Sequence, residues 1–153
     1  MGKSTVYTQV EIAKANEELG KNGLNTQDIL NGAADATTNL AAAAGTDLTT
    51  AATISSDAMA IFDIKASEME KAVDGITGTV NVSKFSVNDY ALALAQGGGV
   101  AKTVGVSFED FNVTIAGISN LFQSGSDAGT SFKVFLQRLI PTSKGAMEGM
   151  MAL

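Results

Sequence analysis

The stretch VSFEDFNVTIAGISNLF, residues 106–122, carries the pattern from which the fold can be predicted. Ser107 stands just before its first large apolar residue, and Asp110 follows three positions later, a spacing typical of the start of a capped helix. The apolar residues then follow at intervals of three and four, which places them on one face of an α-helix. They are Phe108, Phe111, Ile115, Ile118 and Phe122. We therefore predict a helix that buries this stripe against a neighbour.

Similar start signals recur along the whole chain. A glycine or turn segment precedes an apolar residue and a capping residue near positions 23, 45, 64, 85, 105 and 125, at intervals of 22, 19, 21, 20 and 20. Several openings pair a capping residue with an acid three positions later: Asn25 with Asp28, Ser67 with Glu70, and Ser86 with Asp89. Alanine-rich runs such as NLAAAAG favour helix between these turns. An interval near 20 also suits a solenoid, but the unit sequences differ too much to define a repeat.

The fold class that follows is all-α, an array of about seven short helices joined by turns capped by Gly, Ser, Asn or Asp. With 45% hydrophobic but only 6% aromatic residues, such helices bury little area each. A thin core and low stability are expected.

The stretch SGSDAGTSFKVFLQRLIP, residues 124–141, allows two interpretations. Its glycines resemble a phosphate-binding loop, but their spacing does not fit one. The alternative is a helix capped by Ser124 or Ser126, with Asp127 in the first turn, where its charge complements the helix dipole. This second interpretation is favoured. The expected buried stripe is Phe132, Phe135 or Leu136, and Leu139, and Pro141 is expected to end the helix.

Glycine clusters mark places where helices bend or approach closely. Gly97, Gly98 and Gly99 are consecutive, and three glycines inside a helix destabilise it by about 2–3 kcal/mol relative to alanine. A break, a kink or a close helix crossing is the favoured interpretation, and a hinge for unpacking is the functional alternative. Gly125 and Gly129 are further candidates for close approach.

The residue types argue against catalysis. The chain has no Cys and no His, which excludes thiolate nucleophiles, His-based dyads and Cys or His metal sites. Adjacent acids do not share one helix face, and we interpret them as solvated. The prediction is no catalytic, cofactor-binding or metal-ligating residue and no cofactor.

The charge and hydropathy patterns indicate whether the chain binds nucleic acid or crosses a membrane. The net charge is −6 and no basic run exceeds one residue, so no specific nucleic-acid binding is expected. The longest apolar run, YALALAQGGGVA, is shorter than the about 20 residues needed to cross a bilayer, so no membrane span is expected in this segment.

Four pieces of sequence, in order, are similar to the core region of phage tail tape measure proteins. They are the Gly-Leu-Asn helix opening at Gly23, AAAAGTDL at 41–48, YALALAQGGGVAKTVGVSFED at 90–110, and GSDAGTSFKVFLQRL at 125–139. The resemblance covers about residues 17–145. It implies a structural role in the lumen of the assembling tail tube, where such proteins set tail length before they are ejected ahead of the DNA. No catalytic residues are carried over.

The resemblance also implies partners and an origin. The partners are other tape measure copies and tail tube or tail-tip proteins, with a homo-oligomer in the parent assembly. The expected locations are the lumen of the virion tail and, during assembly, the host cytoplasm. Family members are usually several-fold longer, so residues 1–153 are expected to form a single all-α segment, with 1–16 and 146–153 as ends of a longer parent protein.

Two other hypotheses remain at this point. Capped amphipathic helices with small-residue faces also suit a small helical adaptor or interaction domain of bacterial origin. Ala/Gly-rich helices that rearrange could instead form a membrane-active module.

Overall fold

The computed structural model describes residues 7–141 and 144–152. Within these ranges all regular secondary structure is helical and falls into eight segments, one of which is kinked at Asn31 and Gly32, so the all-α expectation is confirmed. The segments are α1 (Gln9–Lys21); α2 (Thr26–Asp28) with η1 (Ile29–Ala33) and α3 (Ala34–Ala44); α4 (Leu48–Phe62); η2 (Ala66–Glu68) with α5 (Met69–Val82); α6 (Val87–Ala93) with η3 (Leu94–Gly98) and α7 (Gly99–Thr103); α8 (Phe108–Ile118) with η4 (Ser119–Leu121); α9 (Gly125–Leu139); and α10 (Lys144–Met151).

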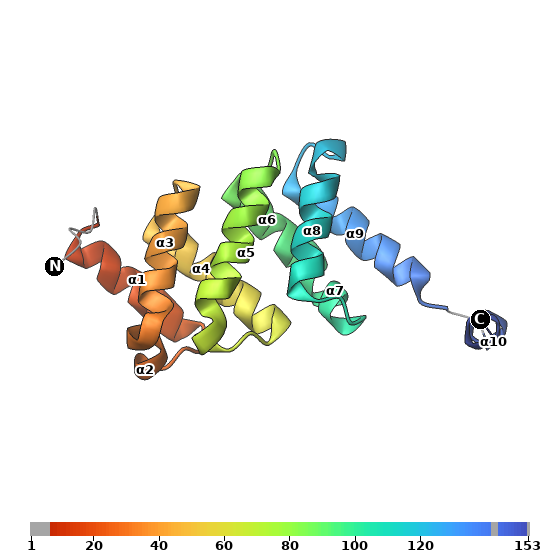
Figure 1. Ribbon diagram of the computed structural model, residues 1–153, viewed down its shortest axis with the longest axis horizontal. Helices are drawn as coiled ribbons and strands as arrows, with labels where there is room; N and C mark the ends of the chain where they lie inside the picture. Colours follow the sequence, from red (N-terminus) through yellow and green to blue (C-terminus); the bar gives the residue numbers. More distant parts are fainter. Residues whose placement is uncertain (1–6, 142–143, 153) are drawn as a thin grey trace.

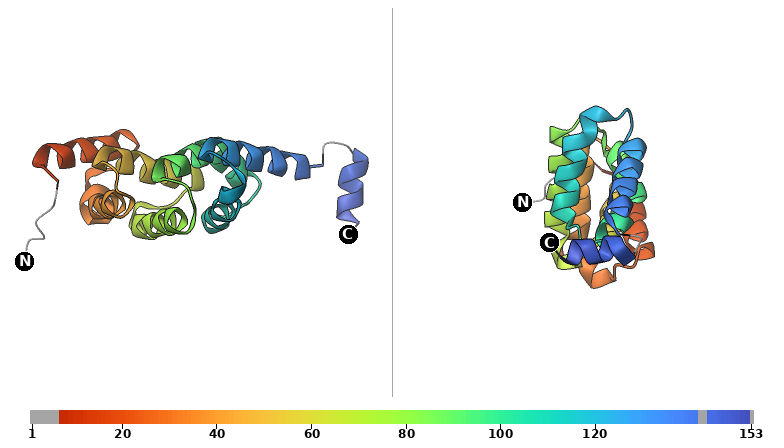
Figure 2. Two further views of the ribbon diagram at one scale, coloured as in Figure 1. Left: turned by 90° about the horizontal axis from the view of Figure 1, so that it is seen from above. Right: turned by 90° about the vertical axis from the view of Figure 1, so that its right-hand side faces the viewer.

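The helices form two rows, and the chain alternates between them (Figure 1). The long row contains α1, α4, the α6–η3–α7 segment and α9, and it follows the long axis of the molecule (Figure 2). The cross row contains α3, α5 and α8, which Figure 2 shows nearly end-on beneath the long row. In the cross row, α5 packs on both α3 and α8; in the long row, α1 packs on α4 and α6 on α9. Contacts between near neighbours make this array similar to a solenoid.

Four turns share one backbone conformation, which explains four of the six regularly spaced helix openings. Each has a residue with positive φ just after a helix: Gly23, Gly45, Asp63 and Gly105. The next residue donates its amide to a carbonyl five positions earlier, at 2.9–3.1 Å, as in a Schellman motif. The residue after that is the N-cap of the following helical segment. The turn is therefore only three residues long and sends the chain to the opposite row.

Most of the predicted caps are present. The side chains of Asn25, Ser86, Ser107 and Ser124 each accept the amide of the acid three residues later. The predicted cap at Ser67 is wrong. Its turn places the N-cap at Lys65, two residues after Asp63, so Ser67 lies inside the 3₁₀ turn that opens the helix.

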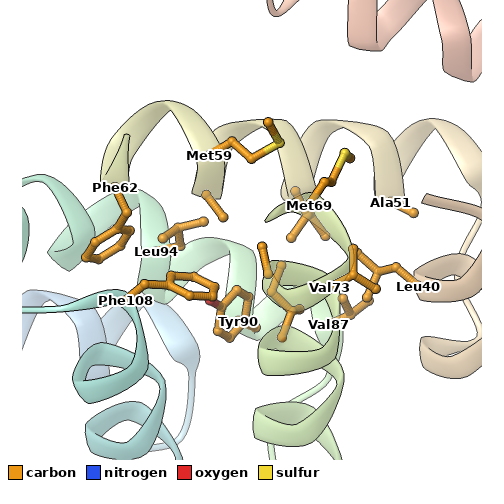
Figure 3. Packing of buried hydrophobic residues seen from close by; sticks show 14 of the residues in the cluster. Leu40, Ala51, Met59, Phe62, Met69, Val73, Val87, Tyr90, Leu94 and Phe108 are labelled. Atoms are coloured by element: carbon orange, nitrogen blue, oxygen red, sulfur yellow. The ribbon is translucent and has the colours of Figure 1, made fainter. Parts of the chain in front are cut away.

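The core lies between the two rows. Eleven of the thirty buried apolar residues described are alanine, and small side chains let helices approach closely. The large side chains gather toward the α8 end, where Phe111 contacts the rings of Phe62, Tyr90 and Phe132 at centroid distances of 5.5, 6.5 and 6.1 Å. Figure 3 shows Phe62, Tyr90 and Phe108 converging from α4, α6 and α8. Such aromatic contacts add to the area they bury.

Candidate interaction surfaces

A close helix crossing joins the α6–η3 segment to α9 and is lined by glycine. A Cβ on Gly129 would lie 2.5 Å from the carbonyl oxygen of Ala93, and one on Gly97 would lie 2.9 Å from the oxygen of Gly129. A Cβ on Gly125 would overlap the carbonyl group of Asp89. Because the obstructing atoms belong to backbone, no side-chain rotation can relieve these clashes. The crossing therefore needs glycine at these positions.

The other two glycines of the triplet have different surroundings. A Cβ on Gly98 would face the side chains of Leu94 and Ile61 at 3.0 and 3.2 Å, while one on Gly99 would meet nothing within 4 Å. The helix does not break at the triplet, because it continues through a π-helical turn from Leu94 to Gly98 into α7. The structure thus places Gly97 at a close crossing. A hinge role for the triplet stays a prediction.

Asp89 joins the start of α6 to the start of α9. Its Oδ2 accepts the Ser86 hydroxyl at 2.7 Å, and its Oδ1 accepts the Gly125 amide at 3.1 Å. These bonds hold the pKa of the Asp89 carboxyl below its usual value, and the bond from Ser86 has the largest effect. Ser124 accepts the Asp127 amide at the same helix start. Side chains thus occupy amides that a phosphate would need, which supports the cap interpretation.

A buried polar pair lies between α6 and α8. The Tyr90 hydroxyl donates to Asn112 Oδ1 at 2.7 Å, and both side chains are buried. Burial raises the pKa of the Tyr90 hydroxyl, so this group remains a proton donor. Sequence reasoning did not identify Asn112. The available signal was a polar residue next to Phe111 on the apolar side of α8.

The predicted apolar stripe of α8 lies mostly inside the molecule. Phe108, Phe111 and Ile115 are buried, while Ile118 and Phe122 are partly buried against the core. This stripe faces the protein's own helices. Because these side chains are buried or partly buried, their exposure does not support a role in binding a partner.

The stripe predicted on α9 needs correction at Leu139, and of the two alternatives Phe135 and Leu136 it is Leu136 that is buried. Phe132 and Leu136 are buried, but Phe135 and Leu139 are 57% and 56% exposed. Gly125, Ala128, Gly129, Phe132 and Leu136 face α6 and η3, which turns Phe135 to the side. Leu139 is three residues after Leu136, on the same side of the helix. It is exposed because it lies in the last turn of α9, beyond the crossing with α6 and η3. Exposed Val134 and Ile140 extend this apolar surface, called here the α9 face.

A second apolar surface is the groove between α5 and α8, called here the α5–α8 groove. It has a volume of about 520 Å³. Gly75 and Gly78 line the α5 side, and Val113 and Ala116 line the α8 side. Val82 and Val113 are 76% and 72% exposed. Glycine leaves the groove open, because a Cβ on Gly78 would meet nothing within 4 Å.

Two lysines near the C-terminal end of α4 are in ion pairs. Lys71 Nζ lies 2.9 Å from a Glu109 carboxylate oxygen, and Lys102 Nζ lies 2.9 Å from Asp63. Lys102 also donates to the carbonyl of Phe62 at 3.2 Å, which satisfies the end of α4. Both lysines line a cavity of about 310 Å³. Each pair links neighbouring helical segments, and its contribution to stability is small because all four side chains are at least 41% exposed.

Two further findings concern the described part of the chain. No cluster of three or more acidic, His or Cys side chains there could hold a metal ion. None of the helices described has both the length and the apolar character needed to span a membrane.

Comparison with known proteins gives two matches. A family model described as "Phage-related minor tail protein" matches residues 1–153. The tape measure protein of Pneumococcus phage Dp-1 is 24% identical over 153 residues, which is all of this chain but 13% of that relative. No solved structure matches significantly.

Proposed function

Because the chain belongs to the family of phage-related minor tail proteins, we propose that it is the core region of a tape measure protein and acts in tail assembly and length determination. The observation that carries this proposal is the match over the complete chain to a tape measure protein. The chain spans 13% of that relative's length. The chain therefore corresponds to a small part of that longer relative.

The two-row fold supports a specific contribution to this function. Stretched into one helix, 153 residues would span about 230 Å at 1.5 Å per residue, but the described helices fold back into an array. An array of this kind is much shorter than a single continuous helix of the same number of residues, so it is poorly suited to setting tail length by its own extension. We infer that it is a packed domain whose presence is needed for the tube to assemble, while length is set together with other parts of the parent protein.

The polar groups support a structural role in preference to an enzymatic one. The Tyr90 hydroxyl is bonded to Asn112, and Lys71 and Lys102 are in ion pairs. Groups engaged in this way hold helices together.

The proposed partners are other tape measure copies and tail tube or tail-tip proteins. The proposed location is the tail lumen, with assembly in the host cytoplasm. The exposed α9 face and the α5–α8 groove support contacts of this type, because exposed apolar surfaces mark interaction sites.

Deletion of this region in a phage that encodes it tests the proposal. An in-frame deletion of the segment corresponding to residues 23–139 is expected to reduce the number of tails or change their length distribution in electron micrographs. A matched deletion of equal length elsewhere in the same gene controls for shortening alone. Tails of normal number and length would overturn the proposal.

The α5–α8 groove also favours a second candidate, a helical interaction module outside the virion. Gene context separates the two candidates. Tail tube and baseplate genes next to the coding sequence favour the tail function, and their absence favours the module.

A further inference from the structure

We propose that the α5–α8 groove of one copy binds the α9 face of a second copy. This inference deepens the proposed contact between copies and rests on that part of the proposed function. It assigns the contact to two different surfaces of one chain.

The groove has a shape suited to a helix that presents large apolar side chains. Gly75, Gly78 and Thr79 make its α5 side shallow, and Phe108 and Asn112 lie on its α8 side. The exposed side chains of Val82 and Val113 add apolar area to its lining. An apolar helix face set into such a groove is a common mode of recognition.

The α9 face offers matching side chains. Phe135 and Leu139 are four residues apart, which places them one above the other on the helix, and Ile140 follows where the helix ends. All three are exposed in the described structure. Phe135 is a large aromatic side chain, the type that anchors interfaces.

Charges of opposite sign lie at the two surfaces. The charged residues that line the groove are Asp74, Glu109 and Lys71, a net charge of −1, and Lys71 is paired with Glu109. The last turn of α9 carries the basic residue Arg138. Arg138 is three residues from Phe135 and four from Val134, so it borders the apolar face. Opposite charges around an apolar contact guide association and select the partner.

This arrangement makes a head-to-tail contact. Because the groove and the α9 face are separate surfaces, a bound pair still offers one free α9 face, on the copy whose groove is filled, and one free groove, on the other copy. Contacts of this type close into rings or extend into open chains.

Two variants separate the surfaces. Gly78→Leu fills the groove at a position where an added side chain has room, so the helix is expected to remain folded. Phe135→Glu places a charge on the α9 face at an exposed position. Leu30→Glu is the matched control, because Leu30 is 74% exposed but lies on η1, outside both surfaces. Circular dichroism of every variant confirms folding.

Sedimentation velocity of the 153-residue chain from about 1 µM to about 1 mM, a range that detects weak association, measures the outcome. The wild-type chain and Leu30→Glu are expected to form species larger than a dimer. Each groove or face variant alone is expected to lose at least about tenfold in association constant. An equal mixture of the two is expected to give a 1:1 dimer and nothing larger, because only one intact groove and one intact face remain in each pair.

Three results would overturn the inference: a wild-type chain that stays monomeric, variants that associate as the wild type does, or a mixture that forms no dimer. If deletion of the region still alters tails while the chain is monomeric, the inference fails and the proposed function stands.

Discussion

At the scale of single residues, the glycines differ in what they contribute. Gly129 and Gly99 both lie in or near the α6–α9 crossing, but only Gly129 approaches a neighbouring backbone. The sequence showed that glycines cluster here, but it could not show which of them approaches another helix, because the contacting positions, such as Asp89 and Gly125, are 36 residues apart. Caps such as Ser107 and Ser124 were predictable, since each depends on an amide three residues away.

Replacing Gly129 with Ala is expected to destabilise the protein strongly. The added Cβ would lie 2.5 Å from the Ala93 carbonyl oxygen, so α9 must move away and the core loosens, at a cost of about 2–3 kcal/mol in the free energy of unfolding. Gly99→Ala, with open space around the new Cβ, is expected to stabilise by up to about 1 kcal/mol. Urea denaturation measures both, and equal stability of the two variants would contradict the assigned crossing.

Replacing Asp89 with Asn is expected to lower stability in a pH-dependent way. The lowered pKa means that the ionised carboxylate stabilises the fold at neutral pH, and that this stabilisation is lost as the pH falls below the usual value of 3.8. We expect a deficit of about 1 kcal/mol at pH 7, which disappears in acid because wild-type Asp89 is then protonated. Denaturation curves at several pH values measure it. A deficit that stays constant down to pH 2 would show that charge plays no part.

At the scale of elements, the turns set where each helix begins. The shared turn conformation places the N-cap two residues after the positive-φ residue, so the turn overrides a local capping signal such as that of Ser67. Composition and spacing predicted the existence and approximate positions of the helices. They did not predict that Phe135 and Leu139 are exposed, because this depends on where α9 extends past its neighbour.

Replacing Gly105 with Ala is expected to destabilise the turn between α7 and α8. Gly105 has a φ of 86°, a conformation that costs an ordinary residue about 1–2 kcal/mol. Gly105→Asn is expected to fall between the wild type and Gly105→Ala, because Asn tolerates positive φ better than Ala does. Thermal unfolding measures the order, with Gly117→Ala inside α8 as the control. The reverse order of Asn and Ala would argue against this turn geometry.

At the scale of the whole molecule, the contacts join mainly neighbouring helices. The regular interval suggested a solenoid, but the sequence could not reveal the two rows, because the repeat units differ while their turns agree. The family resemblance was available from ordered motifs and is confirmed by the family match over residues 1–153.

Thermal unfolding of the whole chain is expected to be shallow. An alanine-rich core with contacts limited to neighbours gives weak cooperativity. Far-ultraviolet circular dichroism is expected to show high helicity that declines over a broad temperature range. A sharp single transition in a chain that light scattering shows to be monomeric would mean that the aromatic contacts around Phe111 couple the rows more strongly than inferred.

The most direct test of the tail function is mass spectrometry of purified tails from a phage that encodes this chain. Trypsin cleavage after Lys102 and Lys133 releases residues 103–133 as one peptide, because no Lys or Arg lies between them. We expect this peptide to be present in intact tails and to be protected from added protease until the tube is opened. Absence of the peptide from purified tails would contradict the proposed place of this chain in the tail, and cleavage in intact tails would contradict a location in the lumen.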